Sequence, residues 1–205
     1  LRRLDRIVRA EARDHGGLAP AAVELRFGRG GPLPALELAW DGERVRLEGR
    51  VDRIDAGPGR LLVVDYKNAR NGDAYEEGLD PEAFGDAAFQ IPAYLMAAAR
   101  AFPGRPRLEA TYALLRRAER LDAVALAAGD PLLAAEPAPP APGGLDAPRP
   151  FAAAVVERVR QIRSGAFPIA SRGCDGCPFG AVCRFQGTAA LAGRAAAAAG
   201  KDAAP

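Results

Sequence analysis

The sequence contains no apolar run of about 18 residues, the length that a membrane-spanning helix needs, so we expect no membrane segment. It also lacks a basic segment followed by an apolar stretch near its start, which argues against a secreted precursor and favours a cytoplasmic protein. Leu1 as the first residue indicates a piece of a longer chain. An excess of charge is missing as well, because 28 basic residues against 26 acidic ones give a net charge of +2. This balance excludes a histone-like polycation, so any contact with nucleic acid must come from a local patch.

Lysine and cysteine are both scarce. Lys67 and Lys201 are the only lysines, and a lone internal lysine suggests a role that arginine, which cannot lose its proton, would not fill. The three cysteines, Cys174, Cys177 and Cys183, cannot all pair in disulfides, so metal or cluster ligation fits them better. A Walker-type Gly-x-x-x-x-Gly-Lys-Ser/Thr sequence is absent, so any ATP-driven translocation must reside elsewhere.

The remaining composition is that of a folded α/β domain. Hydrophobic residues make up 49% of the chain and charged residues 26%, which supports a packed core and excludes global disorder. Helical periodicity predicts helices over residues 1–14, 81–100 and 151–164. Apolar runs between turn residues predict strands over 23–27, 36–40, 44–55, 61–66 and 108–115. We expect the first four strands to form a meander of neighbours, and the proline-rich residues 130–150 to be an irregular connection.

Two predicted strands joined by a Gly-Pro-Gly turn carry the most informative residues. The first strand ends in the sequence GRVDRID over residues 49–55, and the second contains VVDYK over residues 63–67. Because residues two apart in a strand point to the same face, Asp65 and Lys67 should share a face. The hairpin can bring Asp52 beside Asp65. Two carboxylates and one ammonium would then converge near the end of the strands.

This combination has a chemical use. Two hard oxygen ligands can hold Mg²⁺ or Mn²⁺ and leave positions for water and a substrate phosphate. A metal ion of this kind acidifies its bound water, and a lysine beside it can orient the nucleophile or stabilise developing charge. The alternative is a solvated strand face, where an Asp-x-Lys sequence such as Asp65 to Lys67 is common.

The motifs at residues 49–55 and 64–67 resemble those of the PD-(D/E)xK nuclease superfamily, in its RecB/AddB-type branch. The resemblance implies that Asp52 and Asp65 bind a divalent metal, together with the backbone carbonyl of Tyr66, and that Lys67 assists catalysis. The branch also carries a Gln-x-x-x-Tyr motif on the next helix, which matches Gln90 and Tyr94. Residues four apart share a helix face if the helix continues through them.

The Gln90–Tyr94 pair is weak when it is taken alone, since a core-facing tyrosine near a polar glutamine gives the same pattern. Pro92 lies between the two residues and must start, bend or interrupt the helix. After the aspartate and lysine motif, however, the pair supports the same site.

The cysteine segment has the spacing Cys174-x2-Cys177-x5-Cys183. A Cys-x2-Cys turn lets two thiolates reach one metal, and either zinc or an iron–sulfur cluster accepts sulfur ligands. Three unrelated thiols are the alternative. The resemblance implies a structural [4Fe–4S] cluster whose fourth cysteine lies upstream of Leu1. A labile cluster, no cluster or an opportunistic zinc all stay possible for this chain alone.

Several further residues stay open at this level. The family often has a histidine on an upstream helix near the active site. His15 is the only histidine here, but it suits a helix end before Gly16 and Gly17, and we expect the family's histidine upstream of Leu1. Glu24 resembles the edge-strand segment ahead of the hairpin, where a solvated position is the alternative. Five arginines could contact phosphate groups, and the alternative is that they form a solvated face. They are Arg50, Arg53, Arg70, Arg116 and Arg117.

Together these features predict a restriction-endonuclease-like mixed β-sheet flanked by helices, with a C-terminal cysteine-rich clasp. Residues 1–165 would form the nuclease core, 166–186 the iron–sulfur segment and 187–205 an Ala-rich tail. The expected function is Mg²⁺- or Mn²⁺-dependent DNA exonuclease activity in an AddB-like subunit for double-strand break repair, with DNA and a helicase/nuclease subunit as partners. The alternatives are a stand-alone RecB-family exonuclease of the CRISPR-adaptation type and a non-catalytic DNA-binding module.

Overall fold

The computed structural model describes residues 2–12, 16–85, 88–136 and 149–166 of the chain. The chain divides into two units, residues 1–160 and 161–205, and each is considered by itself. The sheets, the core and the candidate site lie in the first unit. His15, the three cysteines and the predicted tail lie outside the described residues, and the proposed cluster therefore stays a prediction. Within the described residues no helix is long and apolar enough to cross a membrane.

The elements follow one another as helix, strands, helices, strands and helix, and where the sequence predicted one strand over 108–115 the structure has β6 followed by β7 and β8. The helices are α1 (Arg2–Glu11), α2 (Asp73–Glu76), α3 (Gln90–Ala101) and α4 (Phe151–Arg163), with 3₁₀ turns η1 (Glu77–Leu79), η2 (Pro81–Gly85) and η3 (Pro131–Leu133). The strands are β1 (Ala19–Phe27), β2 (Leu36–Trp40), β3 (Glu43–Leu47), β4 (Gly49–Gly57), β5 (Arg60–Lys67), β6 (Arg107–Leu114), β7 (Glu119–Arg120) and β8 (Val124–Ala127).

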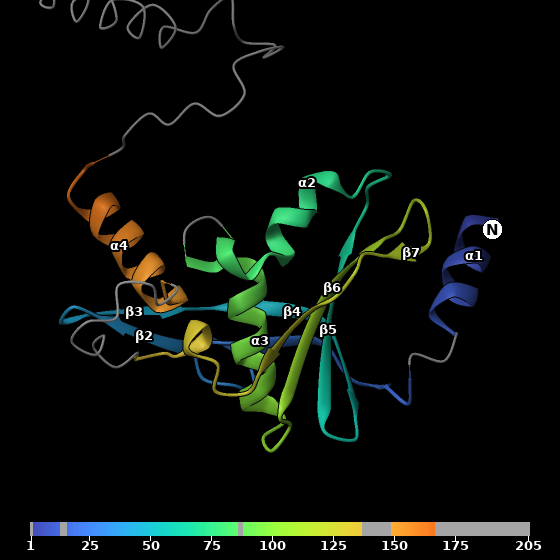
Figure 1. Cartoon of the computed structure of the whole chain (residues 1–205), viewed down its shortest axis with the longest axis horizontal. Coiled ribbons are helices and arrows are strands. Elements are labelled where there is room, and N and C mark those ends of the chain that lie inside the picture. Colours follow the sequence, from blue (N-terminus) through green and yellow to red (C-terminus); the bar gives the residue numbers. More distant parts are fainter. Residues whose placement is uncertain (1, 13–15, 86–87, 137–148, 167–205) are drawn as a thin grey trace, which may run out of the picture. The chain divides into compact units, whose positions relative to one another are not determined.

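The main sheet is mixed, with strand order β1-β4-β5-β6-β7, and β8 also pairs with β6 (Figure 1). Among the described strands only β5 and β6 pair in parallel, and α3 connects them in sequence. The predicted meander is wrong, because β1 pairs with β4 while β2 and β3 form a separate two-stranded sheet. The β2–β3 hairpin thus lies in sequence between two strands that pair with each other. Turn residues predict only which consecutive strands can form a hairpin, so they could not predict the β1–β4 pair.

Two predicted elements are divided in the structure. The strand expected over residues 44–55 is interrupted at Glu48, and its two parts, β3 and β4, belong to different sheets. The helix expected over 81–100 consists of the 3₁₀ turn η2 and then α3, which begins only at Gln90. Pro92 lies in the first turn of α3, where backbone N–H groups have no partner within the helix, so it starts the helix without a kink.

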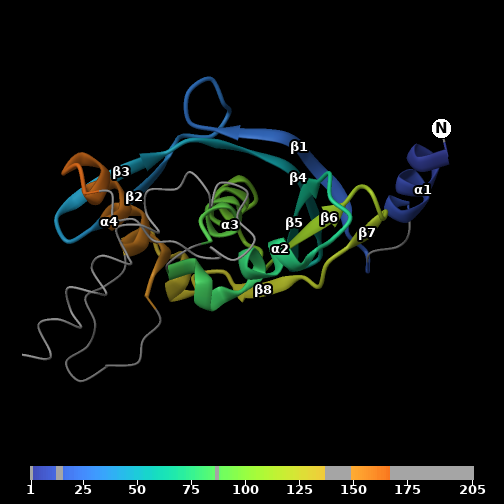
Figure 2. The ribbon, with the colours of Figure 1, turned by 90° about the horizontal axis from the view of Figure 1, so that it is seen from above.

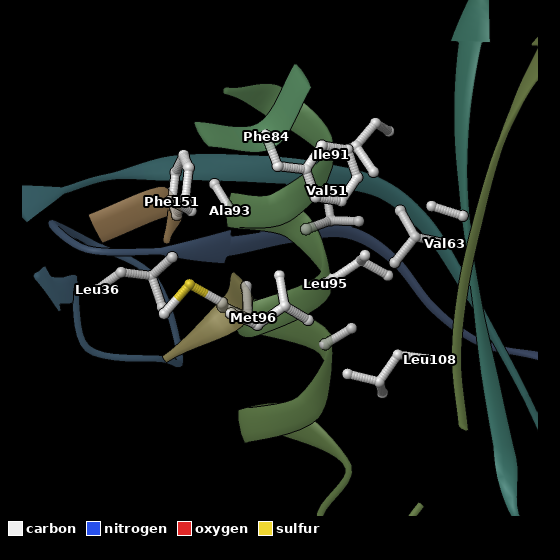
Figure 3. Packing of buried hydrophobic residues seen from close by; sticks show 14 of the residues in the cluster. Leu36, Val51, Val63, Phe84, Ile91, Ala93, Leu95, Met96, Leu108 and Phe151 are labelled. Atoms are coloured by element: carbon white, nitrogen blue, oxygen red, sulfur yellow. The ribbon is translucent and has the colours of Figure 1, made fainter. Parts of the chain in front are cut away.

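The core lies between the sheet and α3. Figure 2 shows α3 enclosed by the bend of the sheet, and α3 contacts β4, β5 and β6. Figure 3 shows Ile91 and Leu95 of α3 packed toward Val51 and Val63 of the sheet, all fully buried. Each such side chain contributes about 1.5–3 kcal/mol relative to an exposed position. This packing fixes the first turn of α3 over the face of β5.

The β1–β4 ladder shifts its register between Pro20 and Ala22, and it also lacks a pair at Glu24 and Asp52. Val51 and Ile54 of β4 are three residues apart, yet both face the same core. Leu25 of β1 pairs with Val51 of β4, and Val23 pairs with Arg53. Glu24 and Asp52, which lie between these pairs, are not paired. Glu24 has a φ of 51°, a left-handed conformation that is uncommon for a residue other than glycine. The strict alternation predicted from sequence is therefore broken at the position of the first predicted metal ligand.

The opposite face of the sheet carries a charged network that joins it to α1, which lies beyond the sheet from α3 in Figures 1 and 2. The Arg53 guanidinium donates to both carboxylate oxygens of Asp55, at 2.6 and 2.9 Å, and to Glu11 of α1 at 2.6 Å. Arg120 of β7 donates to the same Glu11 carboxylate at 2.5 Å. Asp55 is only 1% exposed, so this network holds a charge that burial alone would disfavour.

Candidate active site

Strand β5 presents the second predicted acid and the lysine on the face that packs against α3. Leu61 and Val63 belong to the main core on this face, while Leu62 and Val64 form a second cluster with Tyr66 on the other. By the same alternation, Asp65 and Lys67 follow Val63. The Lys67 ammonium nitrogen lies 2.7 Å from Oδ2 of Asp65, which is 3% exposed. The predicted shared face is thus present in the structure.

Asp52 reaches the same strand from β4. Its Oδ2 accepts a hydrogen bond from the backbone N–H of Tyr66 at 3.0 Å. Tyr66 lies between Asp65 and Lys67 in sequence, so this bond places the Asp52 carboxylate beside the second acid. The interruption of the β1–β4 ladder at Asp52 leaves its backbone outside the regular alternation. The structure therefore brings Asp52, Asp65 and Lys67 together, as the hairpin predicted.

Gln90 links the lysine, the acid and the tyrosine of the helix motif. Its amide oxygen accepts from the Lys67 ammonium at 3.0 Å, and its amide nitrogen donates to Oδ1 of Asp65 at 2.9 Å. The same nitrogen donates to the Tyr94 hydroxyl oxygen at 3.1 Å. Gln90 is the first residue of α3, and Tyr94 follows one turn later on the same helix face. Asp65, Lys67, Gln90 and Tyr94 therefore form one group of polar contacts, and Asp52 adjoins it through the backbone of Tyr66.

Burial raises the pKa of the Asp65 carboxyl above its usual value. The hydrogen bond and charge of Lys67 lower this pKa, whereas the negative charge of Asp52 raises it further. A carboxyl group in this position favours a cationic neighbour, because added positive charge stabilises its ionised form. The electrostatics of the pair thus suit a bound cation.

The donor set also fits a divalent metal in its chemistry. Asp65 Oδ2 is buried, and its close partner among the described residues is the Lys67 ammonium at 2.7 Å. Carboxylate oxygens such as those of Asp65 and Asp52 are hard ligands of the kind that Mg²⁺ and Mn²⁺ prefer. Within the described part of the chain no three His, Cys, Asp or Glu side chains cluster around a possible metal position. The site thus offers two carboxylates, and a backbone carbonyl and water would have to complete the coordination.

Two tyrosines that the sequence did not single out complete the surroundings of Lys67. The ammonium lies 5.0 Å from the ring centroid of Tyr112 on β6 and 5.7 Å from that of Tyr75 on α2. Tyr112 is 4% exposed and pairs in register with Asp65 across the parallel β5–β6 ladder. Both rings approach Lys67 from other elements of the chain. In the sequence, Tyr112 is one of several polar residues among the apolar ones of its strand, so it gave no distinct signal.

Burial also raises the pKa of the Tyr112 hydroxyl to about 12, with a further contribution from the negative charge of Asp65. Between pH 10 and 12 the unfolded chain therefore loses this proton while the folded protein keeps it, so stability falls as the pH rises. Two pKa units correspond to about 3 kcal/mol. We expect the free energy of unfolding of Tyr112→Phe to rise relative to that of the wild type by about 2 kcal/mol between pH 9 and 12, because the folded wild type is half ionised at pH 12; urea unfolding measures this difference. An unchanged difference across that range would contradict the buried neutral hydroxyl.

The predicted arginines have different surroundings. Arg53 is directed into the buried network on the opposite face, and its hydrogen bonds to Asp55 and Tyr66 raise its pKa although burial alone lowers it. This placement contradicts a role in phosphate contact. Arg116 donates to Asn68 at 3.3 Å and Arg117 pairs with Glu119 at 2.9 Å. Arg70 is exposed.

Arg50 belongs to a different basic feature near the first acid. With Arg26 and Arg29 it lines a hollow of about 330 Å³, which Phe27, Glu48 and Gly49 complete. Glu24 does not belong to the Asp65 group in the structure; it forms an exposed ion pair of 2.6 Å with Arg50. Its lining comes from β1, from the turn after β1 and from the start of β4, and it holds three arginines and one acid.

The match to a family model agrees with this geometry. The model of the PD-(D/E)XK nuclease superfamily matches residues 1–184, and the chain belongs to this superfamily. The mixed sheet with helices on its faces is the fold that the sequence predicted.

Curated relatives narrow the similarity to one branch. The chain is 43% identical over 109 residues to a subunit of the ATP-dependent helicase/deoxyribonuclease of Moorella thermoacetica, in a match that covers 50% of this chain and 9% of that protein. It is 39% identical over 108 residues to the protein of the same name from Symbiobacterium thermophilum, in a match that covers 47% of this chain and 8% of that protein. The protein of this name from Bacillus subtilis is 39% identical over 85 residues, in a match that covers 38% of this chain and 7% of that protein. The matched region thus spans less than a tenth of each relative.

Proposed function

We propose that this domain hydrolyses phosphodiester bonds in DNA with the help of Mg²⁺ or Mn²⁺. The observation that carries this proposal is the convergence of Asp52, Asp65 and Lys67 through Tyr66 and Gln90 in a chain of the PD-(D/E)XK nuclease superfamily. Asp52, Asp65 and the Tyr66 carbonyl would hold the metal. When bound, such an ion supplies Lewis-acid charge and acidifies water.

The side chains divide the remaining tasks. Lys67 holds a compact positive charge beside the two acids, where it can donate a hydrogen bond to the attacking water or to a phosphate oxygen. Gln90 fixes the direction of the Lys67 ammonium through its amide oxygen and holds Asp65 through its amide nitrogen. Tyr94 takes the second amide hydrogen and so sets the orientation of that amide.

The substrate would be held by the basic hollow. Arg26, Arg29 and Arg50 can bind the phosphate backbone without reading bases, and such contacts fix the register of DNA on a protein. These arginines replace Arg53 of the sequence prediction, whose guanidinium is already engaged with acids. An acid, Glu24, accompanies Arg50 and would have to release it on binding.

The names of the relatives support a place in a larger assembly. We infer that the chain is the nuclease part of an AddB-like helicase/nuclease subunit that acts with a partner subunit on DNA ends during double-strand break repair. The relatives therefore favour the hypothesis that the chain is part of a larger subunit over the hypothesis that it is a stand-alone exonuclease. We also propose the division into a core of residues 1–165, a cysteine segment over 166–186 and a tail over 187–205, with Cys174, Cys177 and Cys183 as three ligands of a [4Fe–4S] cluster.

Metal dependence tests the proposed chemistry. We expect the chain to degrade linear DNA in Mg²⁺, to leave covalently closed circular DNA intact, and to be inactive after chelation. Asp52→Asn should weaken Mn²⁺ binding, followed by electron paramagnetic resonance, by at least about tenfold, because it removes one of two anionic ligands. The control is Asp122→Asn, an exposed acid between β7 and β8 that takes no part in the contacts of this group. Equal Mn²⁺ affinity in the two variants would remove Asp52 from the metal site, and cutting of closed circles would exclude a strict exonuclease.

A further inference from the structure

We propose that Tyr75 and Tyr112 are positioning residues that hold the Lys67 ammonium between their rings and the Asp65–Gln90 pair. This inference rests on the proposed function of Lys67. The ammonium is 5.0 Å from the Tyr112 centroid and 5.7 Å from the Tyr75 centroid. Both distances lie within the range at which an aromatic face attracts a cation. The two rings also contact one another, with centroids 5.4 Å apart and planes inclined by 49°.

The rings act on a side chain that would otherwise be poorly fixed. Lysine carries a flexible four-carbon stem, and its point charge has no preferred direction of approach. Asp65 and Gln90 contact the Lys67 nitrogen at 2.7 and 3.0 Å. Asp65 is also the acid proposed to bind metal, so its hold on the lysine would weaken when its charge is shared. The ring faces attract the same ammonium without using a carboxylate oxygen, so they can keep it in place.

The fold keeps the Tyr112 ring in position. Tyr112 lies on β6 directly beside Asp65 of β5, and it is almost completely buried. Its hydroxyl meets the 3₁₀ turn η1 at Gly78, where an added Cβ would lie 2.6 Å from the hydroxyl oxygen. Gly78 has no positive φ, so the demand for glycine there is one of space. The turn that follows α2 therefore closes over the ring that faces Lys67.

A purely structural role is the competing explanation, since Tyr112 also belongs to the main core and lines a pocket of about 230 Å³ with Gln90. The two explanations predict different results for two substitutions. Tyr112→Phe keeps the aromatic face and removes the hydroxyl. Tyr112→Leu keeps an apolar side chain and removes the face. If Tyr112 positions Lys67, the Tyr112→Phe variant should keep the position of the ammonium and the Tyr112→Leu variant should lose it. A purely structural role does not require this difference.

The scarcity of lysine makes the geometry directly measurable. The chain has two lysines, so selective ¹³C-lysine labelling gives two sets of side-chain NMR signals, and Lys67→Arg assigns them. In the protein without metal or DNA, we expect the Lys67 signal to be shifted upfield by the ring currents of Tyr75 and Tyr112. Tyr112→Phe should keep this shift, and Tyr112→Leu should reduce it. Tyr75→Leu should reduce the shift as well. Because Tyr75 is partly exposed on α2, this variant is a second test that does not depend on the folding of the buried Tyr112→Leu variant.

The kinetic counterpart uses the same variants on linear DNA with Mg²⁺. Tyr112→Leu should lower kcat by about tenfold, with little change in KM, and Tyr112→Phe should restore most of it. An unshifted Lys67 signal in the wild type, or equal kcat for the Phe and Leu variants, would overturn the positioning role. If the expected shifts are found but the wild type does not cut DNA, the proposed function fails while the aromatic contact stands.

Discussion

Lys67→Met is expected to lower the rate of DNA hydrolysis by about 10²–10⁴-fold, the range for loss of a positioned acid–base or charge-stabilising group. Methionine has a similar length but no charge and no hydrogen-bond donor. The ammonium is the one cation that touches both Asp65 and Gln90 among the described contacts. Single-turnover cleavage of linear DNA with Mg²⁺ measures this loss apart from product release.

Two other variants make the Lys67 test specific. Lys67→Arg keeps the positive charge, but its larger planar group does not fit the position between Gln90 and the rings, so we expect most of the loss to remain. Lys201→Met removes the only other lysine and should cut DNA at the wild-type rate. Cleavage by Lys67→Met at a rate close to that of Lys201→Met would show that Lys67 takes no part in the reaction.

Arg53→Met is expected to reduce the free energy of unfolding by about 3–5 kcal/mol at neutral pH, the cost of removing one partner from a buried ion pair. The second cation near Asp55 is Arg120, and it is 3.8 Å away. The Arg53 side chain is 12% exposed and that of Asp55 only 1%. Removal of the guanidinium also removes the hydrogen bonds that Glu11 and the Tyr66 hydroxyl accept from Arg53 at 2.6 and 3.1 Å, whereas Glu11 keeps its bond from Arg120. Urea unfolding followed by circular dichroism measures the difference.

A matched control lies on the same strand. Arg50→Met breaks an ion pair with Glu24 in which both side chains are about half exposed, and we expect it to cost less than about 1 kcal/mol. The double variant Arg53→Met with Asp55→Leu should recover part of the loss, because it removes the uncompensated buried charge. If the Arg53 and Arg50 variants prove equally stable, the buried network does not stabilise the fold.

The site residues that sequence could predict are related by local periodicity. Alternation along one strand fixes Asp65 and Lys67 on one face, and one helical turn relates Gln90 to Tyr94. A tight turn limits the hairpin, so Asp52 must return close to Asp65. Each of these relations involves neighbouring elements and depends little on the rest of the chain.

The aromatic surroundings of Lys67 could not be predicted in this way. Tyr112 reaches the lysine because β6 pairs in parallel with β5, a register set by the packing of α3, which connects them in sequence. The side of the sheet that Arg53 occupies depends on the interruption of the β1–β4 ladder at Glu24 and Asp52. Regular alternation would have placed Arg53 on the face of Val51, with the proposed site.

The sequence by itself determined the mixed α/β class, the two acids with their lysine, and the helix motif, because these follow from spacing within an element or across one turn. Only the tertiary structure decided which strands are neighbours, which arginines are available for phosphate and which rings contact the lysine. The physical reason is that these relations arise from long-range pairing and burial, and the free energy of such contacts depends on the whole core.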